Sequence, residues 1–330
     1  MKSLFWFSIS FLILMNSCED KNLTDLETRL ISLLDSDDIS GVDGFDTNGD
    51  AELDFETGLE TQNAYKILSD TLVHEDGYKI RFGRQITDKN RTVEFEIGID
   101  TAVGLVTYNI NGVLNVKTFD TTDNTQIDSM SFSKDFSTTF VRRVRFVQIE
   151  NPNEPDASEW KINALTPLVG GSGDKVTISS ISIYELTDVM EKGVLLHQFN
   201  ANGIEKFFIN RESLPVFTAY NSYVIEVSVN NTGPELSIDT TNVGEWVFKN
   251  YGRRFNMRGR KHLNDKGAIL DSILNDNIHT GGWRAHGPGL GLQRRGFRSF
   301  FETIDLATIF VEDAGYNTSI WSIPYKTQRP

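Results

Sequence analysis

The fold is decided by the stretch Val93-Glu94-Phe95-Glu96-Ile97-Gly98-Ile99-Asp100-Thr101-Ala102-Val103-Gly104-Leu105-Val106-Thr107-Tyr108. Apolar and polar residues alternate before its centre and an apolar run follows it, which is typical of strands with a buried face. The centre holds Gly98 and Asp100, and both residue types favour tight turns. The stretch therefore predicts two antiparallel strands joined by a short turn.

Further strands lie on both sides of this hairpin. Runs with a period of two, bounded by polar residues, predict strands at Tyr78–Phe82, Val113–Lys117, Phe140–Ile149 and Trp160–Leu165. A turn that contains proline, from Asn151 to Pro155, separates the last two. We expect these segments to form one antiparallel sheet.

Two helices are expected before the sheet. Leucines recur at steps of three and four residues from Leu23 to Leu34, and Thr24 and Glu27 have the spacing of a capping box. A second helical pattern runs from Glu52 to Leu72, after a stretch rich in Asp and Gly. The first half of the chain is therefore predicted to combine helices with a sheet.

This order of elements resembles a known family. Two helices before a long antiparallel sheet, the turn Ile97–Val106 and the closing Glu159-Trp160-Lys161-Ile162 are similar to nuclear transport factor 2-like and cystatin-like domains. The resemblance implies an α+β cone-shaped domain over residues 23–168, with helices on a curved antiparallel sheet.

Short strands dominate the second half of the chain. They are predicted at residues 194–199, 206–209, 222–229, 246–251, 253–258, 297–301 and 307–311, a spacing that favours a β-sandwich. Gly170 to Gly173 indicates a linker, so residues 169–184 are expected to form a linker and connecting strand.

Two segments of this half resemble immunoglobulin-like modules of bacterial surface proteins. One is the loop His262–Gly267 with Asp271, Asp276 and His279 after it, and the other is the closing Trp321–Tyr325. The resemblance implies an immunoglobulin-like β-sandwich over residues 185–330.

A short apolar leader ends at the only cysteine, Cys18. The run Leu4–Met15 is shorter than the roughly 20 residues that cross a bilayer, so it predicts a removable signal peptide over residues 1–17. Leu14-Met15-Asn16-Ser17-Cys18 resembles the lipobox of Gram-negative lipoproteins. The resemblance implies that Cys18 is acylated, with chains such as palmitate, and that residues 18–22 form a tether at the outer membrane. A plain secretory signal is the alternative.

The residues after the cysteine indicate where in the cell envelope the protein is located. Glu19-Asp20 resembles the acidic export tag of surface-exposed lipoproteins, which indicates the outer face of the outer membrane. The periplasmic face is the alternative.

Composition restricts the possible partners. The chain has 330 residues, enough for two domains, and a formal charge of −14. Between Glu19 and Glu60 there are fourteen acidic and two basic residues, whereas Lys249 to Arg298 holds eleven basic and three acidic residues. The acidic balance argues against nucleic acid as a partner, while the basic tract could face an anionic glycan or an envelope protein. A single cysteine excludes an internal disulfide and a thiolate metal site.

Two acidic segments are candidate Ca²⁺ ligands. Asp46, Asn48, Asp50 and Asp54 alternate oxygen-bearing side chains, but the run is not an EF-hand because Ala51 stands where glycine is needed. The same ambiguity holds for the set Asp265, Asp271 and Asp276, whose side chains also suit backbone turns. We favour solvated loops or turns at both places and expect no bound cofactor.

A loop in the basic tract is the candidate binding surface. Trp283, Arg284 and His286 lie in a glycine-rich segment, and an indole beside a guanidinium can stack on a sugar or bind a carboxylate. The alternative is a hairpin connection with an anchoring tryptophan.

The sequence favours a lipid-anchored envelope protein that acts as a non-catalytic binding or scaffold module, because no nucleophile motif is present. One alternative is a small-molecule hydrolase or isomerase that uses the pocket of the cone-shaped domain, with Tyr65, Asp70, His74 and Tyr108 as candidates. The other is a glycan-binding surface lipoprotein, which requires an exposed Trp283 or Trp246.

Overall fold

The structure is a computed structural model that describes residues 24–42, 72–73, 78–120, 122–151, 154–238, 241–251, 259–267, 270–287 and 296–330. In chain order its elements are α1 (Asp25–Ser36), β1 (Leu72–Val73), β2 (Tyr78–Ile97), β3 (Thr101–Asp120), η2 (Asp128–Met130), β4 (Phe132–Asn151), β5 (Glu154–Leu165), β6 (Leu168–Ser172), β7 (Val176–Leu186), β8 (Lys192–Asn200), η3 (Ile204–Lys206), β9 (Ile209–Asn210), β10 (Val216–Thr218), β11 (Ser222–Asn231), β12 (Leu236–Ile238), β13 (Thr241–Val243), β14 (Glu245–Tyr251), β15 (Gly259–Leu263), β16 (Ile278–Arg284), β17 (Gly296–Asp305), α2 (Ala307–Phe310) and β18 (Thr318–Gln328).

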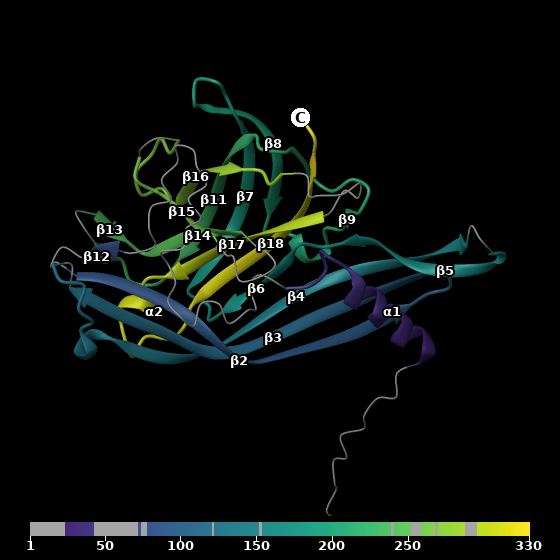
Figure 1. Ribbon diagram of the computed structural model, residues 1–330, viewed down its shortest axis with the longest axis horizontal. Helices are drawn as coiled ribbons and strands as arrows, with labels where there is room; N and C mark the ends of the chain where they lie inside the picture. The colour runs from purple at the N-terminus through teal and green to yellow at the C-terminus, as the bar shows by residue number, and fades with distance from the viewer. Residues whose placement is uncertain are drawn as a thin grey trace, which may run out of the picture.

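Two sheets make up most of the described chain (Figure 1). The larger has the strand order β1-β2-β3-β4-β6-β18-β17-β14-β15, with β5, β9 and β10 attached beside this path. The smaller has the order β16-β11-β7-β8, and its strands β7 and β11 contact β17 and β18 of the larger sheet. The protein is therefore rich in β-structure and sandwich-like, with β2, β3 and β4 extending along its longest axis.

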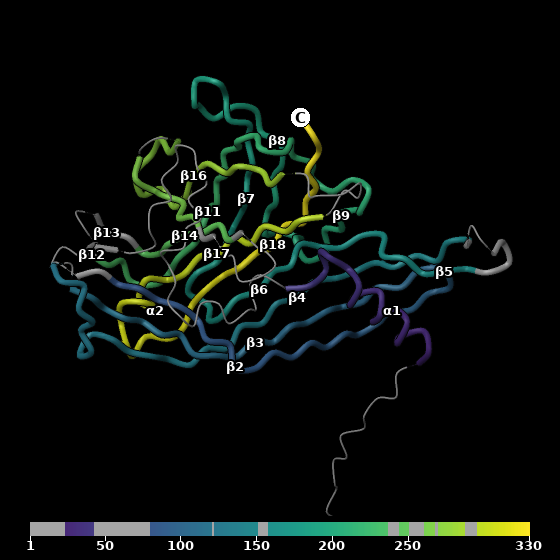
Figure 2. Tube along the Cα trace, viewed as in Figure 1, coloured from purple at the N-terminus to yellow at the C-terminus, as the bar shows by residue number. Residues whose placement is uncertain are grey.

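The first strands are longer than the sequence predicts. β2 and β3 each run for 20 residues and pair from Tyr78 opposite Asp120 to Ile97 opposite Ala102. The polar residues between the strands that we predicted lie at every second position of β3 and face outward. The residues between them are buried. Each strand therefore continues without a break (Figure 2), and β2 accommodates one irregularity between Ile86 and Asp88.

Helix α1 confirms the first helical prediction. The backbone N–H of Thr24 donates to Glu27 Oε2 at 2.8 Å, and the N–H of Glu27 donates to Thr24 Oγ1 at 3.2 Å, which completes the capping box. Leu30 and Leu34 bury the inner side of the helix. The second predicted helix, Glu52–Leu72, lies outside the described residues except for its last residue, which belongs to β1.

The α+β cone predicted for residues 23–168 is wrong. The described part of that segment consists of antiparallel strands with one helix, α1, and no pair of helices covers the sheet. The predicted strand at residues 307–311 is also wrong, because α2 occupies most of it. The alternation of apolar and polar residues correctly predicted strands in β2, β3 and β4. The short motifs that resemble known families did not predict the fold.

The separate immunoglobulin-like sandwich predicted for residues 185–330 is wrong as well. β18 pairs with β6, and β6 pairs with β4, so strands from both halves of the chain share the larger sheet. Gly170 and Gly171 make this pairing possible. A Cβ on Gly170 would lie 2.0 Å from the Thr139 carbonyl oxygen, and one on Gly171 would lie 2.1 Å from that of Thr318. These glycines lie within the sheet rather than in a solvated linker.

The larger sheet curls so that its two ends face each other. The ring of Phe82 on β2 stacks on that of Trp246 on β14, with 6.3 Å between centroids. On the same face, Arg84 forms an ion pair with Glu302 of β17, and its Nε donates to the hydroxyl oxygen of Tyr316 at 2.5 Å. Aromatic packing and a buried ion pair therefore close this part of the core.

Candidate functional site

The indole of Trp283 lies inside the protein. Trp283 is on β16 and is 2% exposed, and the rings of Phe217 and Tyr325 pack edge-on against it at centroid distances of 4.7 and 5.2 Å. The Nζ atom of Lys249 lies 4.8 Å from the ring centroid, within range of a cation–π interaction. Trp246 is also buried, so neither tryptophan offers a face to a sugar at the surface.

The other two residues predicted for binding have separate environments. Arg284 is exposed, and its Nε donates to the carbonyl oxygen of Tyr220 at 3.0 Å. His286 is half-buried, stacks on Phe297 with 5.2 Å between ring centroids, and places Nδ1 2.5 Å from the Tyr325 hydroxyl oxygen. The three candidates therefore do not combine into one exposed surface, and the anchoring role fits Trp283.

Lys249 is a buried cation that the sequence analysis missed. It lies on β14 and is almost completely buried, and burial followed by the charge of Lys261 holds the pKa of Lys249 well below its usual value. Strand alternation contained the clue, because Glu245 and Lys249 share one face of β14 while Trp246 and Phe248 share the other.

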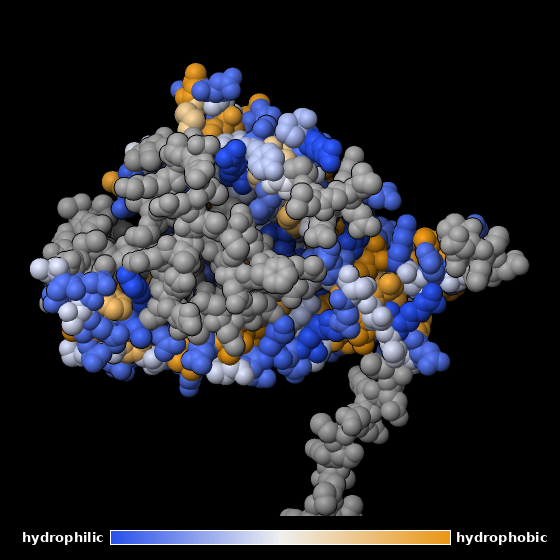
Figure 3. Space-filling model, viewed as in Figure 1, coloured by the Kyte–Doolittle hydropathy of each residue, from blue (hydrophilic) through white to orange (hydrophobic). Residues whose placement is uncertain are grey.

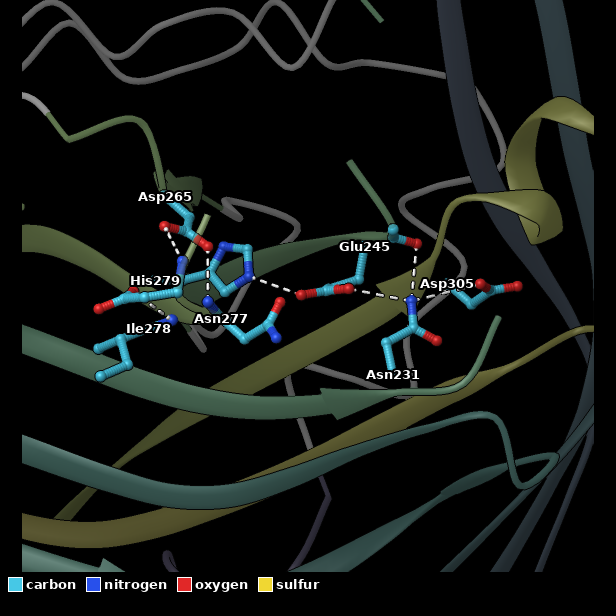
Figure 4. Close-up of polar contacts among 9 residues, drawn as sticks. Asn231, Glu245, Asp265, Asn277, Ile278, His279 and Asp305 are labelled. Atoms are coloured by element: carbon cyan, nitrogen blue, oxygen red, sulfur yellow. Dashed lines mark hydrogen bonds and ion pairs between the residues drawn. The ribbon is translucent and has the colours of Figure 1, made fainter. Parts of the chain in front are cut away.

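A chain of buried polar groups crosses the space between the two sheets (Figure 4). His279 Nε2 on β16 lies 3.0 Å from Glu245 Oε1, and both residues are 3% exposed. Asn231 Nδ2 donates to Glu245 Oε2 at 2.9 Å and lies 3.5 Å from Asp305 Oδ1. These contacts join β11, β14, β16 and β17, and no local spacing in the sequence could have revealed them.

The pKa values of the two carboxyl groups in this network, Glu245 and Asp305, are shifted in opposite directions. Burial opposes ionisation of Glu245, but the hydrogen bond and charge of His279, with the hydrogen bond from Asn231, outweigh it and lower the pKa of Glu245. Burial raises the pKa of Asp305 despite its contact with Asn231. Because His279 and Glu245 are both enclosed and in contact with each other, their role is structural: they link the two sheets.

The acidic set Asp265, Asp271 and Asp276 comes together in space. One oxygen of each carboxylate lies within 4.8 Å of the other two. Asp265 accepts backbone N–H groups from Asp276 at 3.2 Å and Asn277 at 2.9 Å, Asp271 accepts one from Gly267 at 2.7 Å, and Asp276 accepts one from Ile278 at 3.0 Å. The predicted turn-forming role is therefore confirmed, and Ca²⁺ binding, the alternative at this set, stays untested.

Tyr108, a candidate for catalysis, is covered by the segment after α1. Its hydroxyl donates to the carbonyl oxygen of Ser40 at 3.4 Å, and burial raises its pKa. Beside it, Arg142 Nη1 donates to the carbonyl oxygen of Ile39 at 2.6 Å, and burial lowers the pKa of Arg142 to about 10. These polar groups hold the N-terminal segment on the sheet.

Two hairpin turns expose apolar side chains. In the turn between β7 and β8, Val189 is 72% exposed, and Val194 on the adjoining part of β8 is 67% exposed. In the turn between β2 and β3, Ile99 is 97% exposed. The clue in the sequence was the presence of apolar residues at turn positions, where polar residues and glycine are usual.

Several predicted residues lie outside the described part of the chain. They are the lipidation candidate Cys18, the Ca²⁺ candidates Asp46, Asn48, Asp50 and Asp54, and the catalytic candidates Tyr65, Asp70 and His74. Within the described residues, no helix has the length and apolar character needed to cross a membrane.

Comparison with models of protein families, with curated proteins and with solved structures finds no significant match to this chain. The functional argument therefore depends on the geometry described above.

Proposed function

We propose that this chain is a lipid-anchored cell-envelope protein that binds a partner protein and does not turn over a substrate. The leader and its lipobox-like end support acylation of Cys18, and Glu19-Asp20 supports the outer face of the outer membrane. Lipid at Cys18 would attach the β-rich body to the membrane through its N-terminus.

The placement of the ionisable groups supports a non-catalytic role. General acid–base chemistry needs a group within hydrogen-bond reach of a substrate. His279, Glu245 and Asp305 are buried among one another, and Tyr108 lies beneath the segment after α1. The glycan alternative loses its stacking surface, because Trp283 and Trp246 are buried.

The observation that carries the proposal is the exposed apolar character of the β7–β8 hairpin. β8 is an end strand of the smaller sheet, and within the described residues no strand pairs with the edge that faces away from β7. Val189, Val194 and Leu195 are exposed beside that edge. Apolar side chains lie at the tip of this projecting hairpin, on the side of the molecule away from β2 and β3 (Figures 1 and 3).

An end strand with apolar neighbours suits one class of partner. An extended segment of an envelope protein can pair with β8 through main-chain hydrogen bonds and cover Val194 and Leu195 with its own apolar side chains. Such a partner would approach from the side opposite β2 and β3, where the described chain places no membrane-spanning helix.

The anchor is tested by Cys18→Ala. Loss of acylation should release the protein from the membrane fraction, because the anchor is the proposed attachment. A Cys18→Ala protein that stays in the membrane pellet after a high-salt wash would show that the lipid-anchor proposal is wrong.

The partner surface is tested by site-specific photo-crosslinking in intact cells. A photoreactive residue at Val194 should give a discrete adduct of higher mass, whereas the same residue at Thr92, exposed on β2, serves as the matched control. The adduct at Val194 should disappear when Leu195→Asp is added. An adduct that is equally strong at Thr92, or that survives Leu195→Asp, would contradict binding at β8.

A further inference from the structure

The turn between β2 and β3 exposes an apolar side chain to solvent at a position where a polar residue is usual. The N–H of Gly98 donates to the carbonyl oxygen of Thr101 at 2.8 Å, which leaves Ile99 and Asp100 at the tip of the turn. Ile99 is 97% exposed, and Ile97, the last residue of β2, is 44% exposed. A single exposed apolar side chain is common on protein surfaces, but here Ile97 and Ile99 are exposed together at one projecting turn.

Ile97 continues an apolar row of the inner face. Val93 and Phe95 precede it at alternate positions of β2, and the ring of Phe95 lies 6.0 Å from that of Phe146 on β4. The outward positions carry Glu94 and Glu96. The apolar row of the core therefore extends to the tip of the hairpin and ends at the solvent.

Helix α1 begins at the same end of the molecule. Asp35, near the end of α1, forms an ion pair with Arg91 of β2 at 2.7 Å, and α1 contacts β5. β5 lies beside β4 at Val144–Asn151, which is the end where β2 turns into β3. Figure 1 shows α1 running toward this end, so residue 24 and the β2–β3 turn lie at the same end of the molecule.

The chain before α1 is short. Cys18 is six residues from Thr24, and six residues span at most about 20 Å when fully extended. A lipid on Cys18 would therefore hold this end of the molecule, where the β2–β3 turn also lies, close to the bilayer.

We propose that Ile97 and Ile99 enter the bilayer interface as a second membrane contact beside the lipid on Cys18. This inference rests on the proposed lipid anchor. The bilayer is the occupant that fits, because the short tether brings it to this end of the molecule and the exposed side chains of the turn are apolar. Asp100 and the outward Glu94 and Glu96 would stay outside the apolar phase, because a charged side chain there is costly. Two points of contact would fix the orientation of the molecule and direct the β7–β8 hairpin away from the membrane.

The test uses the acylated full-length mature protein carrying Ile99→Trp, in phosphatidylcholine vesicles whose acyl chains are brominated. Bromine quenches tryptophan emission only at short range, so the emission added by Trp at position 99 should be largely lost relative to vesicles without bromine. The wild-type protein gives the background, since Trp160, Trp246, Trp283 and Trp321 are buried.

Ile273→Trp is the matched control, because Ile273 is also an exposed isoleucine but lies in the loop before β16. Its added emission should not change with bromine. If Ile99→Trp floats with the vesicles but is quenched no more than Ile273→Trp, the second contact is wrong while the anchor stands. If the wild-type protein carries no lipid and does not float, the proposed anchor itself is wrong, and the second contact with it.

Discussion

The interior of this protein and its β2–β3 and β7–β8 turns differ in the polarity of their side chains, and in the direction opposite to the usual one. The interior holds ionisable side chains, among them Arg84 with Glu302 and His279 with Glu245, whereas the turns hold Ile99 and Val189 in solvent. In each of these two pairs the partner compensates for lost hydration, so removal of one member leaves the other buried without it. The exposed apolar side chains of these turns bury little surface on folding, and their position suits the binding proposed above.

The largest effect is expected from breaking the buried ion pair between Arg84 and Glu302. Glu302→Ala leaves the guanidinium buried without its carboxylate, and also removes the acceptor of the 3.1 Å hydrogen bond from Asn250. We expect the free energy of unfolding to fall by about 3–5 kcal/mol in urea denaturation. Glu94→Ala, which removes an exposed carboxylate of β2, is the control and should change it by less than about 0.5 kcal/mol. Equal effects of the two variants would contradict a structural role for the interior charge.

A second test concerns the close pairing of β6 with its neighbours. Gly170→Ala brings a Cβ within 2.0 Å of the Thr139 carbonyl oxygen, so the strands must separate, at a cost of about 1–3 kcal/mol in unfolding free energy. Gly315→Ala, whose nearest contact would be at 3.5 Å, is the control and should have little effect. A Gly170→Ala protein as stable as the wild type would instead support a solvated linker at this position.

The pH dependence of stability provides a third test. His262 packs against Trp246 and Phe248, and the partial burial of its ring, followed by the nearby charges of His279 and Lys266, lowers the pKa of His262 to about 3. The unfolded chain, with a pKa near 6.5, binds the proton first, so stability is lost as pH falls from above 6.5 toward 3.

The loss attributable to His262 should reach about 2 kcal/mol at pH 5 relative to pH 7.5. His262→Phe, which retains an aromatic ring, should remove that part of the pH dependence in a series of urea denaturation curves. An unchanged slope between pH 7.5 and pH 5 in His262→Phe would show that His262 is not the titrating group.

The smallest effect on stability is expected at the turns. Ile99→Ser and Val189→Ser should each change the free energy of unfolding by less than about 0.5 kcal/mol, because both side chains are solvated in the folded protein. Ile110→Ser, at a fully buried position of β3, is the control and should be strongly destabilising. Large losses at the turns would mean that these side chains pack against the chain and are not free for binding.

Local patterns in the sequence predicted local structure well. The Thr24–Glu27 capping box marked the start of α1, and the alternation from Ser222 to Val229 predicted β11. Both depend on neighbouring residues alone. The length of β2 and β3 was missed because polar residues on an outward face look like turn residues when only composition is considered.

Long-range pairing could not be predicted in the same way. The place of β6 between β4 and β18 depends on the close approach that Gly170 and Gly171 allow, and glycine runs also occur in linkers. Likewise, Asn231, Glu245 and His279 come from three strands and meet only after both sheets have formed. Of these three residues the sequence drew attention only to His279, as part of a loop, and gave no sign of its contact with Glu245.

The central claim is that the exposed turns bind and the interior charges support the fold. Its most direct test is the yield of the photo-crosslinked adduct at Val194, measured in cells for two variants at equal protein levels. Glu245→Gln, which keeps an oxygen beside His279, should be less stable but retain the adduct. Val189→Asp should be as stable as the wild type and lose it. Retention of the adduct in Val189→Asp together with its loss in folded Glu245→Gln would contradict the account.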